Sequence, residues 1–526
     1  MTSVQPQPNA PTPAAAPTLS GGASAPLQTA AKGRGEPDVR RPWLALAVLM
    51  LPVLLVSVDN TVLAFAVPQL SAQLRPTSAQ LLWIVDVYPL ILAALLVPMG
   101  SAADRFGRRR MLLIGGAGFA VVSAAAAFSP NAGFLIVARA GMAVFGATLM
   151  PATLSLIRNI FTDGKKRRLA IAIWAAGFSA GAALGPIVGG FLLGHFGWGS
   201  IFLMAVPILL PFLALAPFVL PESKNPAPGR LDLVSVVLIA LTMTPIVFGI
   251  TELATGGGGL FSLSFVGIGL GFGAVFIHRQ LRLPSPLLDV SLFTNRVFRG
   301  SVVINLLSVF SLVGFIFFVT QDLQLVIGMN PMSAALVLVP GLAATVAAGL
   351  LVVPIVNRVR PAIVVSANFA LAAIGYALVA FTDTTPGLIM IAFVVLGIGI
   401  GAGETVSNDL ILSNAPPHQA GSASAISETA YEVGAVLGTA IIGGLLTAHF
   451  RNALVIPRGI TDAGGADTLG GAVTLAEELG GATGARLLEN AQEAFASGSV
   501  LTAGIGALLM VGAAVFGAVS LREAEV

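Results

Sequence analysis

Nine ionisable side chains lie inside apolar stretches of this 526-residue chain, and they are the first candidates for chemistry. Eight are acidic and one is basic. Placing a charge in the apolar core of a membrane costs about 3 kcal/mol or more, so such groups commonly mark functional sites. Because the acids outnumber the base, some of them must face water, bind a cation or carry a proton. The nine are Asp59, Asp86, Arg139, Glu252, Asp322, Glu404, Asp409, Glu428 and Glu432.

Asp59 and Asp86 lie toward the same end of the first two apolar stretches. A carboxylate there can alternate between a neutral, protonated form and an anion that attracts a cation. Phe65, Trp83 and Tyr88 are close by in the sequence, and aromatic faces bind organic cations well. We therefore predict that Asp59, in apolar surroundings, provides as an anion the only strong attraction there for a lipophilic cation. The alternative is that each acid packs against a neighbouring backbone or hydroxyl group.

Four further acids lie in two later stretches. Glu404 and Asp409 are five residues apart and so do not share a helix face. Glu428 and Glu432 are four apart and do share one. With no base in the sequence nearby, this pair requires protons or a polar partner, for which Tyr431 offers a hydroxyl. The ring of Tyr431 is a fourth candidate for aromatic contact with the cation. The alternative is a structural hydrogen bond.

The elements that must position these groups are membrane helices. The sequence is 56% hydrophobic and 10% charged, whereas soluble domains contain about 25% charged residues. Fourteen stretches approach or exceed the roughly 20 residues needed to cross a bilayer. They lie near 43–68, 80–100, 111–128, 133–157, 169–193, 198–220, 231–252, 258–280, 297–321, 331–355, 361–381, 387–411, 422–448 and 498–521.

The basic residues predict the orientation. With the N-terminus placed in the cytoplasm, 22 of the 27 Lys and Arg residues fall in cytoplasmic segments and four fall outside. This follows the positive-inside rule and puts both termini in the cytoplasm. The sequence has no cysteine, no metal-binding cluster and no phosphate-binding loop. We therefore expect no metal, no nucleic-acid partner and no ATP-driven step; an ion gradient must supply the energy.

The segment GSAADRFGRRRMLL, at 100–113, predicts a tight cytoplasmic turn in which Asp104 either caps the next helix or pairs with an arginine. Our hypothesis is that Asp104, Arg105 and Arg108 latch the inner ends of the helices through charge pairs. It resembles the pattern G-x-L-a-D-r-x-G-r-k of the major facilitator superfamily, with Ala102 in place of the usual Leu. Arg139 resembles that superfamily's arginine in span four, although Met142 and Ala143 stand where Gln and Gly are usual. The resemblance gives a conformational role to Gly100, Asp104, Arg105, Gly107, Arg108 and Arg139.

Span five contains a glycine every four residues, which predicts a smooth stripe that a neighbouring helix can approach closely. Its sequence WAAGFSAGAALGPIVGGFLL also resembles the antiporter motif G-P-x-x-G-G of the same superfamily. The resemblance implies that this packing seals a proton leak. The motif residues are Gly177, Gly181, Gly185, Pro186, Gly189 and Gly190.

The stretch SVDNTVLAFAVPQL resembles the first-span motif D-x-T-V-x-N-V-A-L-P of the fourteen-span drug:proton antiporters, with Ala64 and Phe65 departing from it. The resemblance implies an all-α membrane protein with a major facilitator fold: two six-helix bundles plus two inserted helices, 14 transmembrane helices in all. It also implies that Asp322, at the outer end of span nine, contacts a cation, although a loop position in water is the alternative.

The implied function is proton-coupled export of lipophilic cationic drugs such as ethidium, quaternary ammonium compounds, dyes and fluoroquinolones. The protein would be no enzyme, would lie in the lipid bilayer of the cell membrane as a monomer, and would use protons as its only coupling ion. The alternatives are a proton-coupled symporter of a small nutrient and a non-transporting membrane scaffold. The expected parts are a disordered cytoplasmic tail (1–42), a six-helix bundle (43–220), two inserted helices with linkers (221–296), a second six-helix bundle (297–521) with a long outer loop (449–497), and a cytoplasmic tail (522–526).

Overall fold

The chain folds into helices throughout the part that the computed structural model describes, which comprises residues 41–224, 232–254, 258–283, 286–356, 358–382, 384–416, 420–458, 460 and 464–522. Fourteen of the helical segments are long and apolar enough to cross a membrane, which confirms the predicted number of spans. Residues 1–40 of the predicted N-terminal tail, and residues 523–526, lie outside the described residues.

The first half of the chain supplies six spans and then an adjacent pair. Helices α6 and α7 together make one span, and α8 and α9 are the pair. The bounds are α1 Pro42–Leu74, α2 Ser78–Phe106, α3 Arg108–Ala127, α4 Ala132–Ile160, α5 Gly164–His195, α6 Gly199–Leu203, α7 Ala205–Val219, α8 Leu233–Ala254 and α9 Gly259–Arg282.

The second half supplies six more spans, two of which contain a π-helical turn, η2 or η4. The bounds are η1 Val290–Thr294, α10 Arg296–Gln321, η2 Asp322–Val326, α11 Pro331–Val356, α12 Pro361–Phe381, α13 Pro386–Ser413, α14 Ala420–Leu437, η4 Gly438–Gly443, α15 Gly444–Ala453, η5 Gly464–Asp467, α16 Leu469–Leu479 and α17 Gly481–Ser520.

Several helices begin where a side chain caps the free backbone N–H groups. Thr77 and Gln80 form a reciprocal capping box at the start of α2, and Asn131 caps α4. Asp163 caps α5 by accepting bonds from the N–H groups of Lys165 and Lys166. These hydrogen bonds hold the pKa of the Asp163 carboxyl below its usual value, and the bond from the Lys166 N–H has the largest effect. Such caps satisfy donors that the helix itself leaves unpaired.

The glycine stripe of α5 packs directly against α1, which confirms the predicted close approach of a neighbouring helix and identifies that helix. A Cβ atom added at Gly181 would lie 2.8 Å from Cβ of Ser57, and one added at Gly185 would lie 1.8 Å from Oγ1 of Thr61. Gly190, on another side of α5, faces Met332 of α11, with an added Cβ 2.8 Å from its Cα. Helix α5 therefore contacts both halves of the chain through positions that have no side chain.

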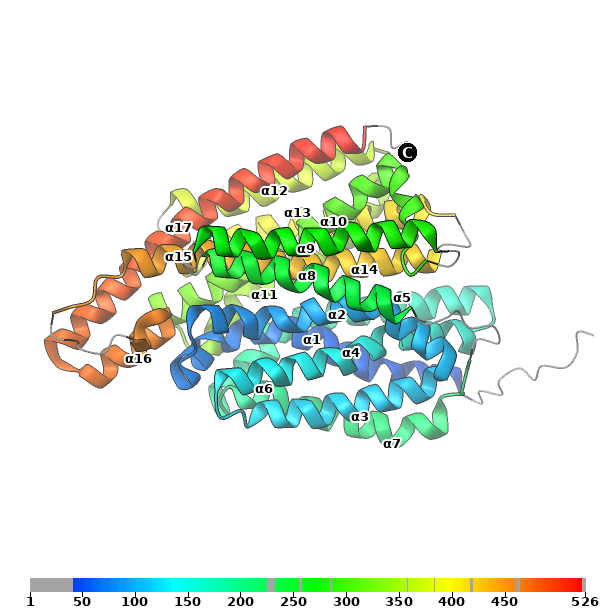
Figure 1. Cartoon of the computed structure of the whole chain (residues 1–526), viewed down its shortest axis with the longest axis horizontal. Coiled ribbons are helices and arrows are strands. Elements are labelled where there is room, and N and C mark those ends of the chain that lie inside the picture. The colour runs from blue at the N-terminus through cyan, green and yellow to red at the C-terminus, as the bar shows by residue number, and fades with distance from the viewer. Residues whose placement is uncertain are drawn as a thin grey trace, which may run out of the picture.

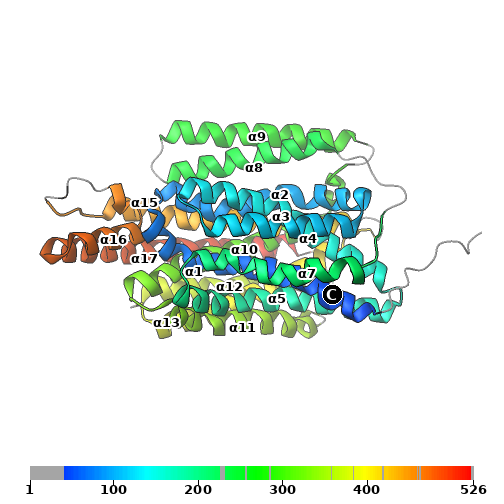
Figure 2. The ribbon, with the colours of Figure 1, turned by 90° about the horizontal axis from the view of Figure 1, so that it is seen from below.

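The helix pair α8 and α9 lies along one edge of the molecule, beside α2 (Figure 2). Only 22% of the most apolar window of the α8 span and 11% of that of the α9 span are buried. Their remaining surface is apolar and exposed, as expected for helices in contact with lipid.

The long loop 449–497, expected to lie outside, forms a helical excursion at one end of the molecule. Helix α16 projects from that end, away from the C-terminal end of the chain (Figure 1). The Ser78 hydroxyl donates a hydrogen bond of 2.6 Å to the carbonyl of Asp467, and Arg75 forms an ion pair with Glu478. The last helix was predicted to begin at residue 498 but begins at Gly481, because the acidic segment before it continues the same helix.

Candidate functional site

A cavity of about 80 Å³ lies between the first and second halves of the chain. Helices α1, α2 and α4 contribute one wall, and α10, α14 and η4 contribute the other. Most of the lining is apolar, including Leu312 and Phe317. The polar lining residues are Asn60, Thr61, Tyr88, Arg139, Tyr431, Glu432 and Thr439.

Arg139 and Asp59 form an ion pair at the edge of this cavity. The guanidinium Nη1 lies 2.8 Å from Oδ2 of Asp59, and both side chains are at least 96% buried. Its Nε donates a longer bond, of 3.4 Å, to the carbonyl of Ile84. Asp59 was expected to attract a lipophilic cation as an anion in apolar surroundings, but here its carboxylate is already paired with Arg139, the one basic side chain predicted inside a span. The two residues are 80 positions apart in the chain, so no local sequence pattern indicated that they would meet.

Tyr88 and Arg139 form a second contact within the site. The Arg139 guanidinium lies over the Tyr88 ring, 4.4 Å from its centroid, and Phe119 meets that ring edge-on at 6.5 Å. A cation so placed is attracted by the electron-rich face of the ring. The Tyr88 hydroxyl is buried and has no hydrogen-bond partner among the described residues.

Asp86 lies behind the cavity wall, on the side of η4. Its carboxyl group faces the hydroxyl of Thr439, which lines the cavity. Only 1% of Asp86 is exposed, and neither carboxylate oxygen has a hydrogen bond of good geometry within the described part of the chain. A buried acid in such a position is strongly favoured in its protonated form or beside a cation.

Three acids of the second half lie near one another. Glu428 is close enough to Glu404 and to Glu432 for their negative charges to repel each other. Glu432 lines the cavity and is 4% exposed, and none of the three forms an ion pair in the described ranges. Asp409 lies apart from them with an exposed side chain. The described residues contain no group of three His, Cys, Asp or Glu side chains that could hold a metal ion.

Of the four aromatic side chains predicted to contact a cation, two line the cavity. They are Tyr88 and Tyr431, and Phe178 of α5 packs edge-on against Tyr431 at 6.4 Å. Trp83 instead packs 6.4 Å from Phe248 of α8. The sequence did not indicate which face of α2 the pair α8 and α9 covers.

Phe65 also lies away from the cavity and is buried, near the Gly189 position of α5. It follows Asp59 by six residues, which places it about 120° away around the helix. A direct cation contact at Phe65 is therefore absent from this arrangement.

Asp322 is buried rather than at the outer surface. The helix was expected to end there, but it continues through η2 to Val326, and 2% of Asp322 is exposed. Its carboxyl group faces the Ser499 hydroxyl of α17. The π-helical turn adds a residue to the helix, and such turns are frequent at functional sites.

The segment 100–113, expected to face the cytoplasm, contains a charge pair between Asp104 and an arginine. Arg108 Nη2 lies 2.7 Å from Oδ1 of Asp104, and the turn at Gly107 has φ = 112°, which favours glycine. Arg105 takes no part in this pair and instead lies 5.9 Å from the ring centre of Phe106. Gly100 lies inside α2, where it packs against Pro151 of α4, and is not part of the turn.

The segment that follows α7 fastens this turn. The carboxylate of Glu222 accepts hydrogen bonds from the backbone N–H groups of Arg109 and Arg110. Ser223 accepts bonds from Arg108 and from Asn159 of α4. The sequence pattern did not reveal these partners, because they come from a loop more than 100 residues away.

Comparison with known proteins identifies relatives along most of the chain. The family model "Major Facilitator Superfamily" matches residues 49–439. The multidrug efflux pump LfrA of Mycolicibacterium smegmatis is 51% identical over 92% of this chain and 97% of its own length. The methyl viologen resistance protein SmvA of Salmonella typhimurium is 35% identical over 90% of this chain and 97% of its own length. The crystal structure of a bacterial homolog of the human lysosomal transporter Spinster is similar in fold, with a TM-score of 0.68, 19% identity, and 93% of this chain and 98% of that one covered.

Proposed function

The chain belongs to the major facilitator superfamily, and on that premise we propose that it exports lipophilic organic cations in exchange for protons. Membership makes it a multi-pass membrane transporter of the drug-efflux type and not an enzyme. The relative named for methyl viologen resistance supports organic cations as substrates. Ethidium, quaternary ammonium compounds, dyes and fluoroquinolones are the proposed range.

One observation carries the proposal: buried acids without a basic partner surround the cavity between the two halves. Glu432 lines the cavity, Asp86 lies beside it, and neither forms an ion pair in the described part of the chain. An unpaired buried carboxylate must be neutralised by a proton or by a bound cation. One site can thus hold either a proton or a drug, which is the requirement for exchanging them.

In the proposed cycle, a cationic drug from the cytoplasm or inner leaflet meets Glu432 in its ionised form, with Tyr88 and Tyr431 contacting its rings. Protons from the outside neutralise the acid and release the drug. Protonation of Asp59 breaks its ion pair with Arg139 and couples the charge state of the site to the packing of α1 against α4. Asp322, Glu404, Asp409 and Glu428 are further proton or cation positions in this scheme.

The cavity also limits what can bind without rearrangement. Its volume is about 80 Å³, whereas sites for drug-sized molecules are commonly 300 Å³ or more. The two walls must therefore separate to admit a polycyclic cation. We propose that they do so by rocking of the two bundles, residues 43–220 and 297–521, with the Asp104–Arg108 pair as part of the cytoplasmic latch and the α5 stripe as the seal against proton leak.

We propose a monomer in the cell membrane with both termini in the cytoplasm. The distribution of basic residues supports this orientation. The alternatives of a nutrient symporter and a non-transporting scaffold receive no support from the drug-efflux relatives.

Ethidium transport by the purified protein in sealed vesicles tests the proposal. We expect an imposed pH gradient to drive transport and an uncoupler to stop it, while ATP has no effect. Transport driven by ATP and insensitive to the pH gradient would refute proton coupling. Absence of cation transport under both conditions, with a folded protein, would refute the substrate class.

A further inference from the structure

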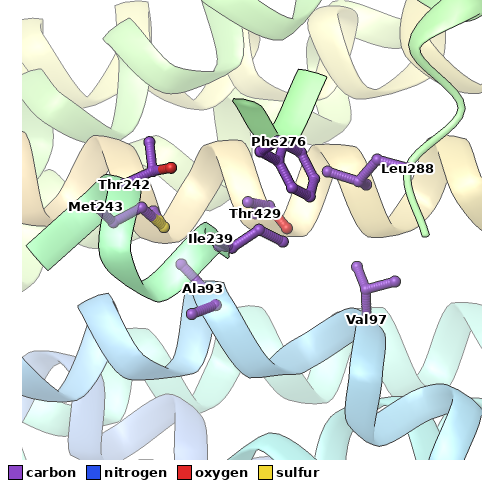
Figure 3. Close-up of a pocket in the computed structure, with 9 residues that line it drawn as sticks. Ala93, Val97, Ile239, Thr242, Met243, Phe276, Leu288 and Thr429 are labelled. Carbon is purple, nitrogen blue, oxygen red and sulfur yellow. The ribbon is translucent and has the colours of Figure 1, made fainter. Parts of the chain in front are cut away.

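A second cavity, of about 150 Å³, lies between the α8–α9 pair and the body of the protein (Figure 3). Ala93, Ala94 and Val97 of α2 form one wall, and Ile239, Thr242 and Met243 of α8 form another. Phe276 of α9, Leu288 and Thr429 of α14 complete the lining (Figure 3).

This lateral cavity is separate from the central one. Both cavities use α2 and α14, but Val85, Tyr88 and Pro89 of α2 face the central cavity, whereas the lateral one begins at Ala93. Leu90, Val247 and Val436 pack together next to it. The pair of helices α2 and α14 is therefore a shared wall with a cavity on each side.

The lateral cavity lies in the cytoplasmic half of the bilayer, given the proposed orientation. Its α2 residues lie past the midpoint of that helix, toward the Phe106 end, and Thr429 lies in the first third of its span, Ser422–Ala453. On its other side are α8 and α9, most of whose surface is exposed and apolar. The surrounding inner leaflet is therefore the nearest source of an occupant.

The polarity of the lining and the volume of the lateral cavity limit which molecules can occupy it. No charged side chain lines the cavity, and its polar groups are the hydroxyls of Thr242 and Thr429. A cation placed there would leave water without a carboxylate to offset the cost. A cavity of about 150 Å³ with apolar walls accepts one benzene-sized group, which is too small for a polycyclic dye and suits a segment of a hydrocarbon chain.

We propose that the lateral cavity binds a segment of a phospholipid acyl chain from the inner leaflet. The chain lies between the α8–α9 pair and the shared wall of α2 and α14. Leu288 closes the cytoplasmic end, held in place because the Gln280 side-chain carbonyl accepts hydrogen bonds of 2.7 and 3.3 Å from the N–H groups of Leu287 and Leu288. The inserted helices thus form a lipid site against the moving part of the transporter.

The test uses the full-length protein in nanodiscs containing phosphatidylcholine with a photoreactive diazirine in the middle of one acyl chain. After illumination, mass spectrometry locates the labelled residues. Ala93 and Ala94 are 2% and 6% exposed, so only a molecule inside the cavity can label them. We expect label at these two alanines in addition to the lipid-facing side of α8 and α9.

Two variants fill the cavity from opposite walls, Ala93→Phe and Ile239→Trp, so that a folding failure of one leaves the other. Each should abolish labelling of the α2 wall, at Ala94 in the first variant and at both alanines in the second. The matched control Ala274→Phe adds a phenyl group to the exposed side of α9 and should leave the labelling of Ala93 and Ala94 unchanged. Label confined to the lipid-facing surfaces of wild-type protein would overturn the proposal.

A competition experiment distinguishes lipid from substrate as the source of the chain. Dodecyltrimethylammonium, a cation with one alkyl chain, should leave the Ala93 and Ala94 label in place. Its removal by that cation would overturn the proposal and assign the cavity to the substrate's alkyl tail. Because labelling requires no transport, its result is independent of whether the proposed function is correct.

Discussion

Substituting Asp59 by Asn should destabilise the folded chain more than neutralising both members of its ion pair with Arg139. Both side chains are almost completely buried, and their charged atoms lie 2.8 Å apart. The substitution leaves the guanidinium charge without a carboxylate, supported only by the Ile84 carbonyl and the ring of Tyr88. The double substitution Asp59→Asn with Arg139→Gln removes that uncompensated charge.

The magnitude follows from the burial. Two unit charges about 4 Å apart attract each other by about 4 kcal/mol at an effective dielectric constant of about 20, and breaking a buried pair by removing one partner costs about 3–5 kcal/mol. An exposed pair contributes about 0–1 kcal/mol. The control is Arg75→Gln, because the Arg75–Glu478 pair is about half exposed on both sides.

Thermal unfolding of the purified protein, followed by fluorescence in one detergent, provides the assay. We expect wild type to have the highest melting temperature, followed by Arg75→Gln and then the double variant. The two single variants, Asp59→Asn and Arg139→Gln, should both melt below the double variant. If the double variant melts at or below the temperature of either single variant, the two side chains do not stabilise each other and the pairing is refuted.

Three further outcomes are expected. Gly185→Ala should strongly reduce the yield of folded protein, because its Cβ would lie 1.8 Å from the Thr61 hydroxyl oxygen, whereas Gly194→Ala on the same helix meets nothing within 4 Å and should express normally. Asp86→Asn should damage efflux of divalent cations more than of monovalent ones, because each positive centre needs its own desolvated carboxylate; equal losses would indicate a general coupling role. Burial opposes ionisation of Asp232, but hydrogen bonds from Arg279 and Ser235 outweigh it and hold the pKa of Asp232 below its usual value. The ionised carboxylate therefore stabilises the fold above about pH 4, and this stabilisation is lost as the pH falls further. The melting temperature of Asp232→Asn should lie below that of wild type at pH 7 by an amount that shrinks in acid, and a difference constant with pH would contradict this.

The number of spans and the close packing at the α5 glycines were predictable because each depends on a local pattern, although the identity of the helix that packs there was not. Span length follows from consecutive apolar residues, and the glycines of α5 recur with the period of a helix face. The charge pair of Asp104 with Arg108 is also local, since the two are four residues apart. The structure confirms the number of spans and the close helix packing at the α5 glycines, and of the two alternatives for Asp104 it shows the pair with an arginine.

The partners of the site residues were not predictable in the same way. Arg139 could have paired with any of eight acids, and the choice of Asp59 depends on how α4 packs against α1. The position of Trp83 against Phe248 depends on where the inserted pair attaches. The π-helical turn at Asp322 changes the direction in which the following side chains point, and no sequence pattern predicts such a turn.

The glycines of α5 also constrain how this protein can change under selection by new drugs. At Gly181, Gly185, Gly189 and Gly190 a single added carbon would already collide with α1 or α11, so no side chain can be gained there to alter the range of compounds. Variation compatible with folding is left to the cavity-facing positions of α2 and α14, where Tyr88 and Tyr431 stand. A library that randomises those positions and keeps the α5 glycines should therefore yield folded pumps with altered drug ranges far more often than one that randomises α5.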